Sequence, residues 1–311
     1  MLKLIALGVL SGAFFSTTFI FNEVMSVAGG HWVWSASLRY AFMILFLTLI
    51  ILYNGGLQQL RSVVALFFEH WTFWTVAGGI GFGGFYALIC FSADFAPGWV
   101  IAATWQFTVV ASLFVFMLFG RRFPLRIWLF SAIIFLGVVL VNMSNVEQFD
   151  LTLLLTGGLP VLIAAFCYPF GNQLVWEATN GENTKLPKIH SPLLSNVFNK
   201  VFLMTLGSIP LWIILVLITT PPLPSVEQII NSSLVALFSG VCATSIFLFT
   251  RNLAKTSSEL AGVDATQASE VIFALGGSML FLGGAVPGMT AFAGLILILV
   301  GLVFFIRYQH I

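Results

Sequence analysis

The sequence predicts an all-α polytopic membrane protein with ten transmembrane helices, arranged as two inverted repeats of five helices. Three observations lead to this prediction: a composition poor in charge, ten long apolar stretches, and a one-sided distribution of lysine and arginine. Of the 311 residues, 59% are hydrophobic and only 7% are charged, whereas a soluble domain carries about 25% charged residues. This composition excludes an ordinary soluble protein.

Composition and motifs also exclude several ligands. The net charge of +1 provides no electrostatic footprint for nucleic acid. The three cysteines lie singly in apolar runs, without the spacing of a metal site or a disulfide framework. We therefore expect no metal and no other cofactor. The chain also lacks the phosphate-binding loop of ATP-driven pumps, so any energy that it uses would come from a gradient or from a partner.

Ten stretches are apolar over a length that crosses about 30 Å of hydrocarbon, and backbone groups in lipid must be satisfied within a helix. The predicted spans are residues 4–27, 32–53, 71–92, 98–119, 127–143, 151–175, 193–218, 228–250, 258–282 and 288–306. For the first span, the small residues of 26–28 make a signal peptide the alternative. Apolar residues at helical spacing over 57–68 predict either a short amphipathic helix on the cytoplasmic face or an extension of the third span.

The basic residues define an orientation. Those in alternate connections or at the termini are Lys3, Arg61, Arg121, Arg122, Arg126, Lys185, Lys188, Arg251, Lys255 and Arg307. The other connections, near 28–31, 93–97, 144–150, 219–227 and 283–287, contain no lysine or arginine. By the positive-inside rule, both termini are predicted to be cytoplasmic and the number of spans to be even. The short loops favour the plasma membrane.

Residues 1–146 and 147–311 are expected to form the two repeats, which align at an offset of about 163 residues. This alignment places 102–106 on 265–269, and Arg39 corresponds to Lys200. Because each half holds an odd number of spans, the second half must enter the membrane from the opposite side. Inverted repeats are typical of secondary transporters, whose substrate site lies near the midplane where the halves meet.

Short motifs in both halves carry a resemblance to a known family. They are Leu38-Arg39-Tyr40, Ala87 to Ala93, and a glycine followed by a proline after the fourth and ninth spans. With these motifs the chain resembles the drug/metabolite transporter superfamily over nearly its whole length. The stretch 265–273 is most similar to the branch of multidrug resistance efflux transporters. The resemblance implies ten helices in two five-helix repeats. In place of the superfamily's usual Gly-Glu pattern, this chain has Gly120-Arg121 and Gly283-Gly284.

Two glutamates are candidates for the substrate or coupling-ion site, because an ionisable side chain inside a span is costly and usually marks a pathway. Glu270 lies near the middle of the ninth span, with Thr266 and Gln267 one turn below. Burial disfavours the charged carboxylate, so Glu270 is predicted to exchange a proton for a cationic solute. The alternative is a structural partner for a basic residue. Glu23, beside Asn22 in the first span, resembles in its location the essential glutamate of small multidrug transporters in the same superfamily.

Other polar residues inside spans have two interpretations each. Arg39 and Lys200 either contact the substrate or extend to the nearest interface. Trp105 and Gln106 lie level with Glu270 by repeat symmetry, where a tryptophan ring either holds a cation or only packs. Asn172 in the sixth span either belongs to the site or bonds a neighbouring helix.

The leading functional hypothesis is proton-coupled efflux of small amphipathic or cationic organic solutes. A second hypothesis is transport of an anionic metabolite held by Arg39 and Lys200. A channel is the alternative from another class. An enzyme is not expected, because the spans contain no nucleophile with a base and no pair of aspartates. Expected partners are a small-molecule substrate, the lipid bilayer and protons, with sodium left open as coupling ion, no nucleic acid, and a monomer or homodimer as the assembly.

Overall fold

The computed structural model describes residues 2–120, 125–144, 151–180, 185–253, 263, 266–284 and 286–308. These residues form helices joined by short connections, and no strand occurs among them. Eight helical spans are long and apolar enough to cross a membrane, and shorter apolar helices cover Thr266–Leu282 and Met289–Phe305. The prediction of an all-helical polytopic membrane protein is therefore confirmed, and each of the ten predicted stretches carries a helix.

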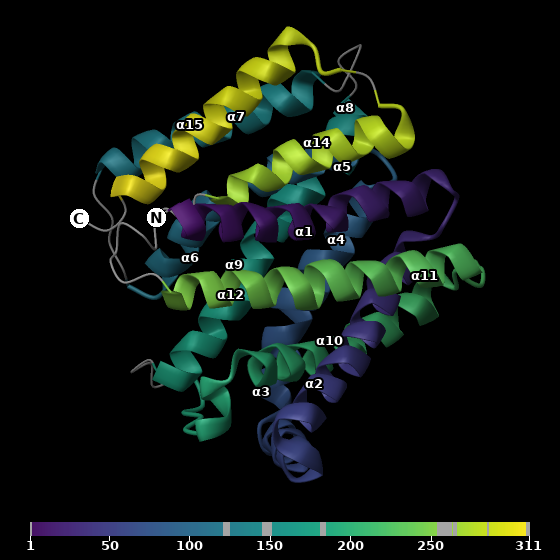
Figure 1. The fold of residues 1–311 in the computed structure, drawn as a ribbon, viewed down its shortest axis with the longest axis vertical. Coiled ribbons are helices and arrows are strands. Elements are labelled where there is room, and N and C mark those ends of the chain that lie inside the picture. The colour runs from purple at the N-terminus through teal and green to yellow at the C-terminus, as the bar shows by residue number, and fades with distance from the viewer. Residues whose placement is uncertain are drawn as a thin grey trace.

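The helices follow the chain in two sets. The spans of the first half are α1 (Leu2–Val27), α2 (Trp32–Glu69), α3 (Trp71–Gly78) with η1 (Gly79–Gly84) and α4 (Phe85–Ser92), α5 (Gly98–Trp105) with α6 (Thr108–Leu118), and α7 (Leu125–Ser144). The second half begins with a span made of α8 (Leu151–Leu153), η2 (Leu154–Gly158) and α9 (Leu159–Asn180). The short turn η3 (Pro192–Ser195) leads into the next span, α10 (Val197–Thr219). The last three spans are α11 (Val226–Val235) with η4 (Ala236–Ala243) and α12 (Thr244–Leu253), η5 (Thr266–Ala268) with α14 (Ser269–Leu282), and α15 (Met289–Tyr308). The segments η1, η2 and η4 are π-helical turns within longer helices. Helix α1 begins and α15 ends on the same side of the bundle, as an even number of spans requires (Figure 1).

Helix α2 changes direction at Gly56. The φ of this residue is 66°, a left-handed conformation that glycine adopts without steric cost. The residues that follow form a separate helical segment with one buried side, including Val63 and Leu66, and exposed side chains such as Phe68. His70, with a φ of −126°, separates this segment from α3. The segment therefore continues α2 after a bend and does not extend the third span.

Helix α1 lies at the centre of the bundle. It packs against α14 on one side, against η4 and α12 on the other, and also against α5 (Figure 1). Helix α10 packs against α2 and α3, and α7 pairs with α15 at the edge of the molecule. Helices from both halves of the chain thus pack against α1.

The pair α7 and α15 is built from equivalent residues. A Cβ atom on Gly137 of α7 would lie 2.8 Å from Cγ1 of Ile298, and one on Gly301 of α15 would lie 2.7 Å from Cγ1 of Ile134. The two glycines are 164 residues apart in the chain, and so are the two isoleucines. Small residues allow membrane helices to approach closely. Each half therefore contributes the same glycine and isoleucine to this contact, which supports the proposed division into two repeats.

Candidate functional site

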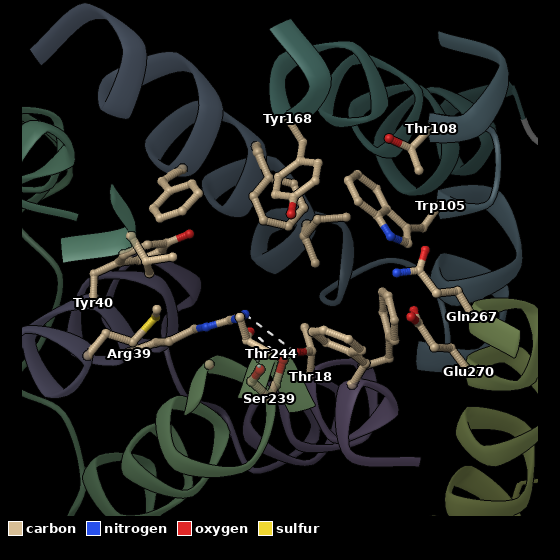
Figure 2. A pocket seen from close by; sticks show the side chains of 18 residues that line it. Thr18, Arg39, Tyr40, Trp105, Thr108, Tyr168, Ser239, Thr244, Gln267 and Glu270 are labelled. Atoms are coloured by element: carbon tan, nitrogen blue, oxygen red, sulfur yellow. Dashed lines mark hydrogen bonds between the residues drawn. The ribbon is translucent and has the colours of Figure 1, made fainter. Parts of the chain in front are cut away.

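A cavity of about 180 Å³ lies among the central helices (Figure 2). Its wall includes side chains from eight of the ten spans, and only α7 and α15 contribute no described residue to it. Two ionisable residues of opposite charge type line it, Arg39 from α2 and Glu270 from α14. The remaining wall is mostly aromatic or aliphatic, with a few hydroxyl and amide groups.

The spans around the cavity are irregular at its level. The π-turns η1 and η4 carry the lining residues Phe82 and Ser239 in the third and eighth spans. In the fourth span, the N–H groups of Gln106 and Phe107 donate to carbonyls three residues earlier, between α5 and α6. In the ninth span, the 3-10 turn η5 precedes α14. The sequence alignment makes these two pairs of spans equivalent. Irregular turns thus occur in the same two spans of each half, although at this offset η1 corresponds to 242–247 and not to the whole of η4 (Ala236–Ala243). Helix irregularities of this kind are frequent at functional sites.

Arg39 points into the cavity and is held only by neutral groups (Figure 2). Its terminal nitrogens donate to Oγ1 of Thr18 at 3.4 Å and to Oγ of Ser239 at 3.3 Å. The guanidinium carbon lies 4.1 Å from the ring centroid of Tyr86, a cation–π contact. Among the described residues no carboxylate lies within 4.0 Å of it, and its Nε–H has no hydrogen-bond partner. A guanidinium stays protonated, so this part of the cavity carries an uncompensated positive charge.

Asn22 supports this arrangement without lining the cavity. Its side-chain amide and the hydroxyl of Tyr86 exchange hydrogen bonds of 3.1 and 3.3 Å. Tyr86 also contacts Tyr40 edge to face, with ring centroids 5.6 Å apart. Asn22 therefore orients the ring on which the Arg39 guanidinium rests, and acts on the cavity through Tyr86.

Glu270 faces the cavity from the other side (Figure 2). It lies in the first turn of α14, and only 6% of its surface is exposed. In the part of the chain that the structure describes, no ion pair involves its carboxylate. Gln267 lies beside it on the same wall. The positive end of a helix favours a carboxylate in the first turn, yet a charged group at this depth is costly without a partner. The side chain thus needs either a proton or a cationic ligand.

Three rings form a continuous aromatic wall. The centroid of Phe85 lies 4.8 Å from that of Trp105 and 5.1 Å from that of Tyr168, and the last two are 5.7 Å apart. Trp105 lies on the same side as Glu270 in Figure 2. Such a surface packs against an apolar or aromatic solute, and the face of a tryptophan ring also attracts cations.

Glu23 lies outside the cavity wall and joins three helices. Its carboxylate accepts hydrogen bonds from the backbone N–H of Gly98 at 2.8 Å and from the hydroxyl of Ser278 at 3.1 Å. Nearby, the hydroxyl of Ser26 donates to Asp94 at 2.6 Å. These bonds hold α1 against the start of α5, against α14 and against the connection after α4. The structure therefore places Glu23 in a helix junction.

Four other predicted residues do not line the cavity. Lys200 lines a separate cavity together with His190, so the structure does not bring it to Arg39. The amides of Gln106 and Asn172 donate to carbonyls four residues earlier in their own helices. Thr266 packs against α1 at Gly8, one turn from Glu270. Arg121, Arg122 and Lys255, which the sequence places in cytoplasmic connections, lie outside the described residues.

Sequence reasoning missed several lining residues. Thr18 and Ser239 bind the guanidinium, and Tyr40 and Tyr168 contribute to the wall. Tyr40 follows Arg39 in the motif that carried the family resemblance, which was an available signal. Hydroxyl-bearing residues are common in membrane spans, and nothing in the spacing of Thr18, Ser239 and Tyr168 along the sequence distinguished them from the others.

Comparison with known proteins identifies the family. Residues 2–311 match the family model described as "Putative multidrug resistance efflux transporter". The chain belongs to this family. Membership implies a transporter rather than an enzyme, with a small-molecule substrate and a multi-pass location in a membrane.

Two bacterial relatives of the transporter carry no assigned activity. It is 37% identical over 317 residues to "Uncharacterized protein YjlA" of Bacillus subtilis (strain 168), covering 97% of this chain and 93% of the relative. It is 35% identical over 282 residues to an "Uncharacterized 42.1 kDa protein in intracellular alkaline protease 3'region" of Shouchella clausii, covering 86% and 70%. A solved structure titled "Crystal structure of protein" has a TM-score of 0.59 at 13% identity, covering 99% of this chain and 98% of that one, so the fold is shared.

Proposed function

We propose that this transporter exports small organic solutes by secondary active transport, with the central cavity as the solute site and Glu270 as the proton site. The observation that carries the proposal is a buried carboxylate, without an ion-pair partner among the described residues, inside a cavity to which both halves contribute. A proton neutralises this carboxylate when the cavity is empty, and a cationic group of the solute neutralises it when the cavity is filled. Proton and solute then compete for one residue, which is the basis of exchange.

The two halves supply the movement that exchange requires. In the proposed inverted repeats, the halves rock about the cavity and open it to one side at a time. The reciprocal contact of α7 with α15 and the paired irregular spans support this division of the chain. The distribution of basic residues supports a plasma-membrane protein with both termini in the cytoplasm. One chain contains the whole cavity, so a monomer suffices.

The test is proton movement in liposomes that contain the purified protein. A dye reports internal pH while organic cations, amphipathic solutes and anions are added, for wild type, Glu270→Gln and Glu177→Gln. Glu177 is a matched control, because it is buried outside the cavity, where its carboxylate accepts a bond from Gln173 at 3.0 Å. We expect solute-dependent proton movement in wild type and Glu177→Gln and its loss in Glu270→Gln. An unchanged response in Glu270→Gln would overturn the proton site.

A second candidate function is transport of an organic anion, which the uncompensated charge of Arg39 favours. Lys200 lies at another cavity, so an anion would rest on Arg39 alone. In the same assay this function predicts a response only to anions, abolished by Arg39→Gln and preserved in Glu270→Gln.

A further inference from the structure

The two ionisable groups of the cavity face each other without forming an ion pair. Figure 2 shows the Arg39 guanidinium and the Glu270 carboxylate on opposite sides of the open space, each directed toward it. Within the described part of the chain, no nitrogen of Arg39 lies within 4.0 Å of a carboxylate oxygen. The cavity is therefore a dipolar site, positive at one end and acidic at the other, and a ligand can enter between the two ends.

A solute with a single charge fits this site poorly. A cation beside Glu270 leaves the Arg39 charge uncompensated and adds a second positive charge in a medium of low dielectric constant. An anion at Arg39 leaves Glu270 without a cationic partner. A solute with both charges compensates both ends at once, and each pairing then replaces the solvation that burial has removed.

Resting on the proposed function, we propose that the solute is a small zwitterion with an apolar or aromatic body, whose carboxylate binds Arg39 and whose ammonium binds Glu270. A carboxylate accepts two parallel N–H bonds from a guanidinium. Arg39 retains donors for them, since each terminal nitrogen carries two hydrogens and makes one bond to a protein hydroxyl.

The walls between the two charges define the body of the solute. The cluster of Phe85, Trp105 and Tyr168 offers ring faces, and the amide of Gln267 lies beside the acidic end (Figure 2). An α-amino acid with an aromatic side chain has this combination: two opposite charges close together, and one ring that packs on rings at separations of about 4.5–7 Å.

The experiment compares three probes with the same phenyl ring and two-carbon chain. L-Phenylalanine carries both charges, phenylethylamine lacks the carboxylate, and 3-phenylpropionate lacks the ammonium. Binding to the purified full chain in detergent is measured by titration calorimetry at one pH. We expect phenylalanine to bind at least about tenfold more tightly than either of the other probes, the equivalent of about 1.4 kcal/mol.

Three variants assign the two charges. In Arg39→Gln, phenylalanine should bind no better than phenylethylamine, while phenylethylamine keeps or improves its own affinity. In Glu270→Gln, phenylalanine should bind no better than 3-phenylpropionate, which keeps its affinity. The retained probe in each case reports that the variant is folded. The control Lys200→Gln removes a charge at the separate cavity and should leave all three affinities unchanged.

Two results would overturn the zwitterion proposal. One is that either single-charge probe binds wild type within about tenfold of phenylalanine, and the other is that phenylalanine shows no binding. If these occur while organic cations still drive proton exchange that Glu270→Gln abolishes, the proposed function stands and only the solute class is wrong. If no solute of the panel drives exchange, the proposed function fails as well.

Discussion

The carboxylate of Glu23 in α1 accepts a hydrogen bond from the backbone N–H of Gly98, the first residue of α5, at 2.8 Å. A second bond, from Ser278, ties the same carboxylate to α14. One side chain therefore holds three helices together at one end of the cavity-forming bundle. Charge-assisted bonds of this kind are stronger than neutral ones, and Glu23→Gln weakens them while Glu23→Ala removes them.

We predict that Glu23→Ala opens the cavity toward this end. In a cysteine-free background, Thr18→Cys places a thiol at the cavity wall. In the orientation that the basic residues predict, this end faces outside, so a membrane-impermeant maleimide added to intact cells measures access to the thiol. Labelling should rise several-fold in Glu23→Ala and less in Glu23→Gln, because loss of the bonds shifts the population toward the opened form. Equal labelling with and without Glu23 would show that the junction does not close the cavity.

The contact between α7 and α15 predicts matched costs in the two halves. An alanine at Gly137 places its Cβ 2.6 Å from the carbonyl oxygen of Gly294, and one at Gly301 meets Ile134. Each should destabilise the protein by about 1–3 kcal/mol through overpacking. Gly276→Ala is the control: apart from the neighbouring backbone of its own helix, no atom of the described residues lies within 4 Å of its Cβ position, so stability should hold or rise by up to about 1 kcal/mol, the helix propensity difference. Unfolding temperature in detergent measures all three.

The ring under Arg39 predicts a difference between two substitutions of Tyr86. Tyr86→Phe keeps the ring at the guanidinium and loses the hydroxyl, together with its bonds to Asn22. Tyr86→Leu loses the cation–π contact, which contributes about 2 kcal/mol when it is desolvated. Phenylalanine affinity should fall at least about tenfold in Tyr86→Leu and markedly less in Tyr86→Phe. Similar losses in both would assign the effect to the hydroxyl instead of the ring.

Exchange of a zwitterion for one proton predicts a net movement of charge. The solute carries no net charge outward, whereas the proton carries one positive charge inward. Efflux of radiolabelled phenylalanine from proteoliposomes should therefore accelerate when a potassium diffusion potential makes the interior negative. Efflux of phenylethylamine, a cation exchanged for a proton, is the internal control and should not respond. A phenylalanine efflux that ignores the potential would exclude this stoichiometry.

Asp94, in the connection between α4 and α5, predicts a pH dependence of stability. Burial raises the pKa of Asp94 above its ordinary value of 3.8, while the bond from Ser26 and the nearby His31 offset part of the rise. The folded state then binds more protons than the unfolded state, so the free energy of unfolding falls as pH rises through and above that value. Asp94→Asn should flatten this fall, measured as unfolding temperature against pH. Parallel curves for wild type and variant would contradict the prediction.

The spans were predictable from sequence because the cost of a polar backbone in lipid imposes long apolar stretches. The rule that ionisable residues inside spans mark a pathway singled out Arg39 and Glu270, and both line the central cavity. The same rule also selected Glu23 and Lys200, which lie at a helix junction and at another cavity. Depth along a helix was readable in each case, whereas the direction of the side chain depends on how the helices pack.

Other parts of the site leave no sequence trace. Thr18, Ser239 and Tyr168 are neutral, and only their positions around Arg39 and Trp105 give them a role. The π-turn η1 did have a signal, because four of its six residues are glycine and glycine weakens a helix. The π-turn η4 contains a single glycine, Gly240, which does not by itself predict a π-turn. The bend at Gly56 did have a signal, since a glycine pair precedes the amphipathic segment.

Glu270 is the sole carboxylate on the described wall of the cavity, and under the proposed exchange this sets a thermodynamic ceiling. A single titrating carboxylate carries one proton per cycle, so each unit of pH difference sustains at most about a tenfold solute gradient. For a zwitterion, a potential of 100 mV adds about 2.3 kcal/mol per cycle, a further factor of about 50. At one unit of pH difference and 100 mV, the two factors together limit the outward gradient of a zwitterion to about 500-fold.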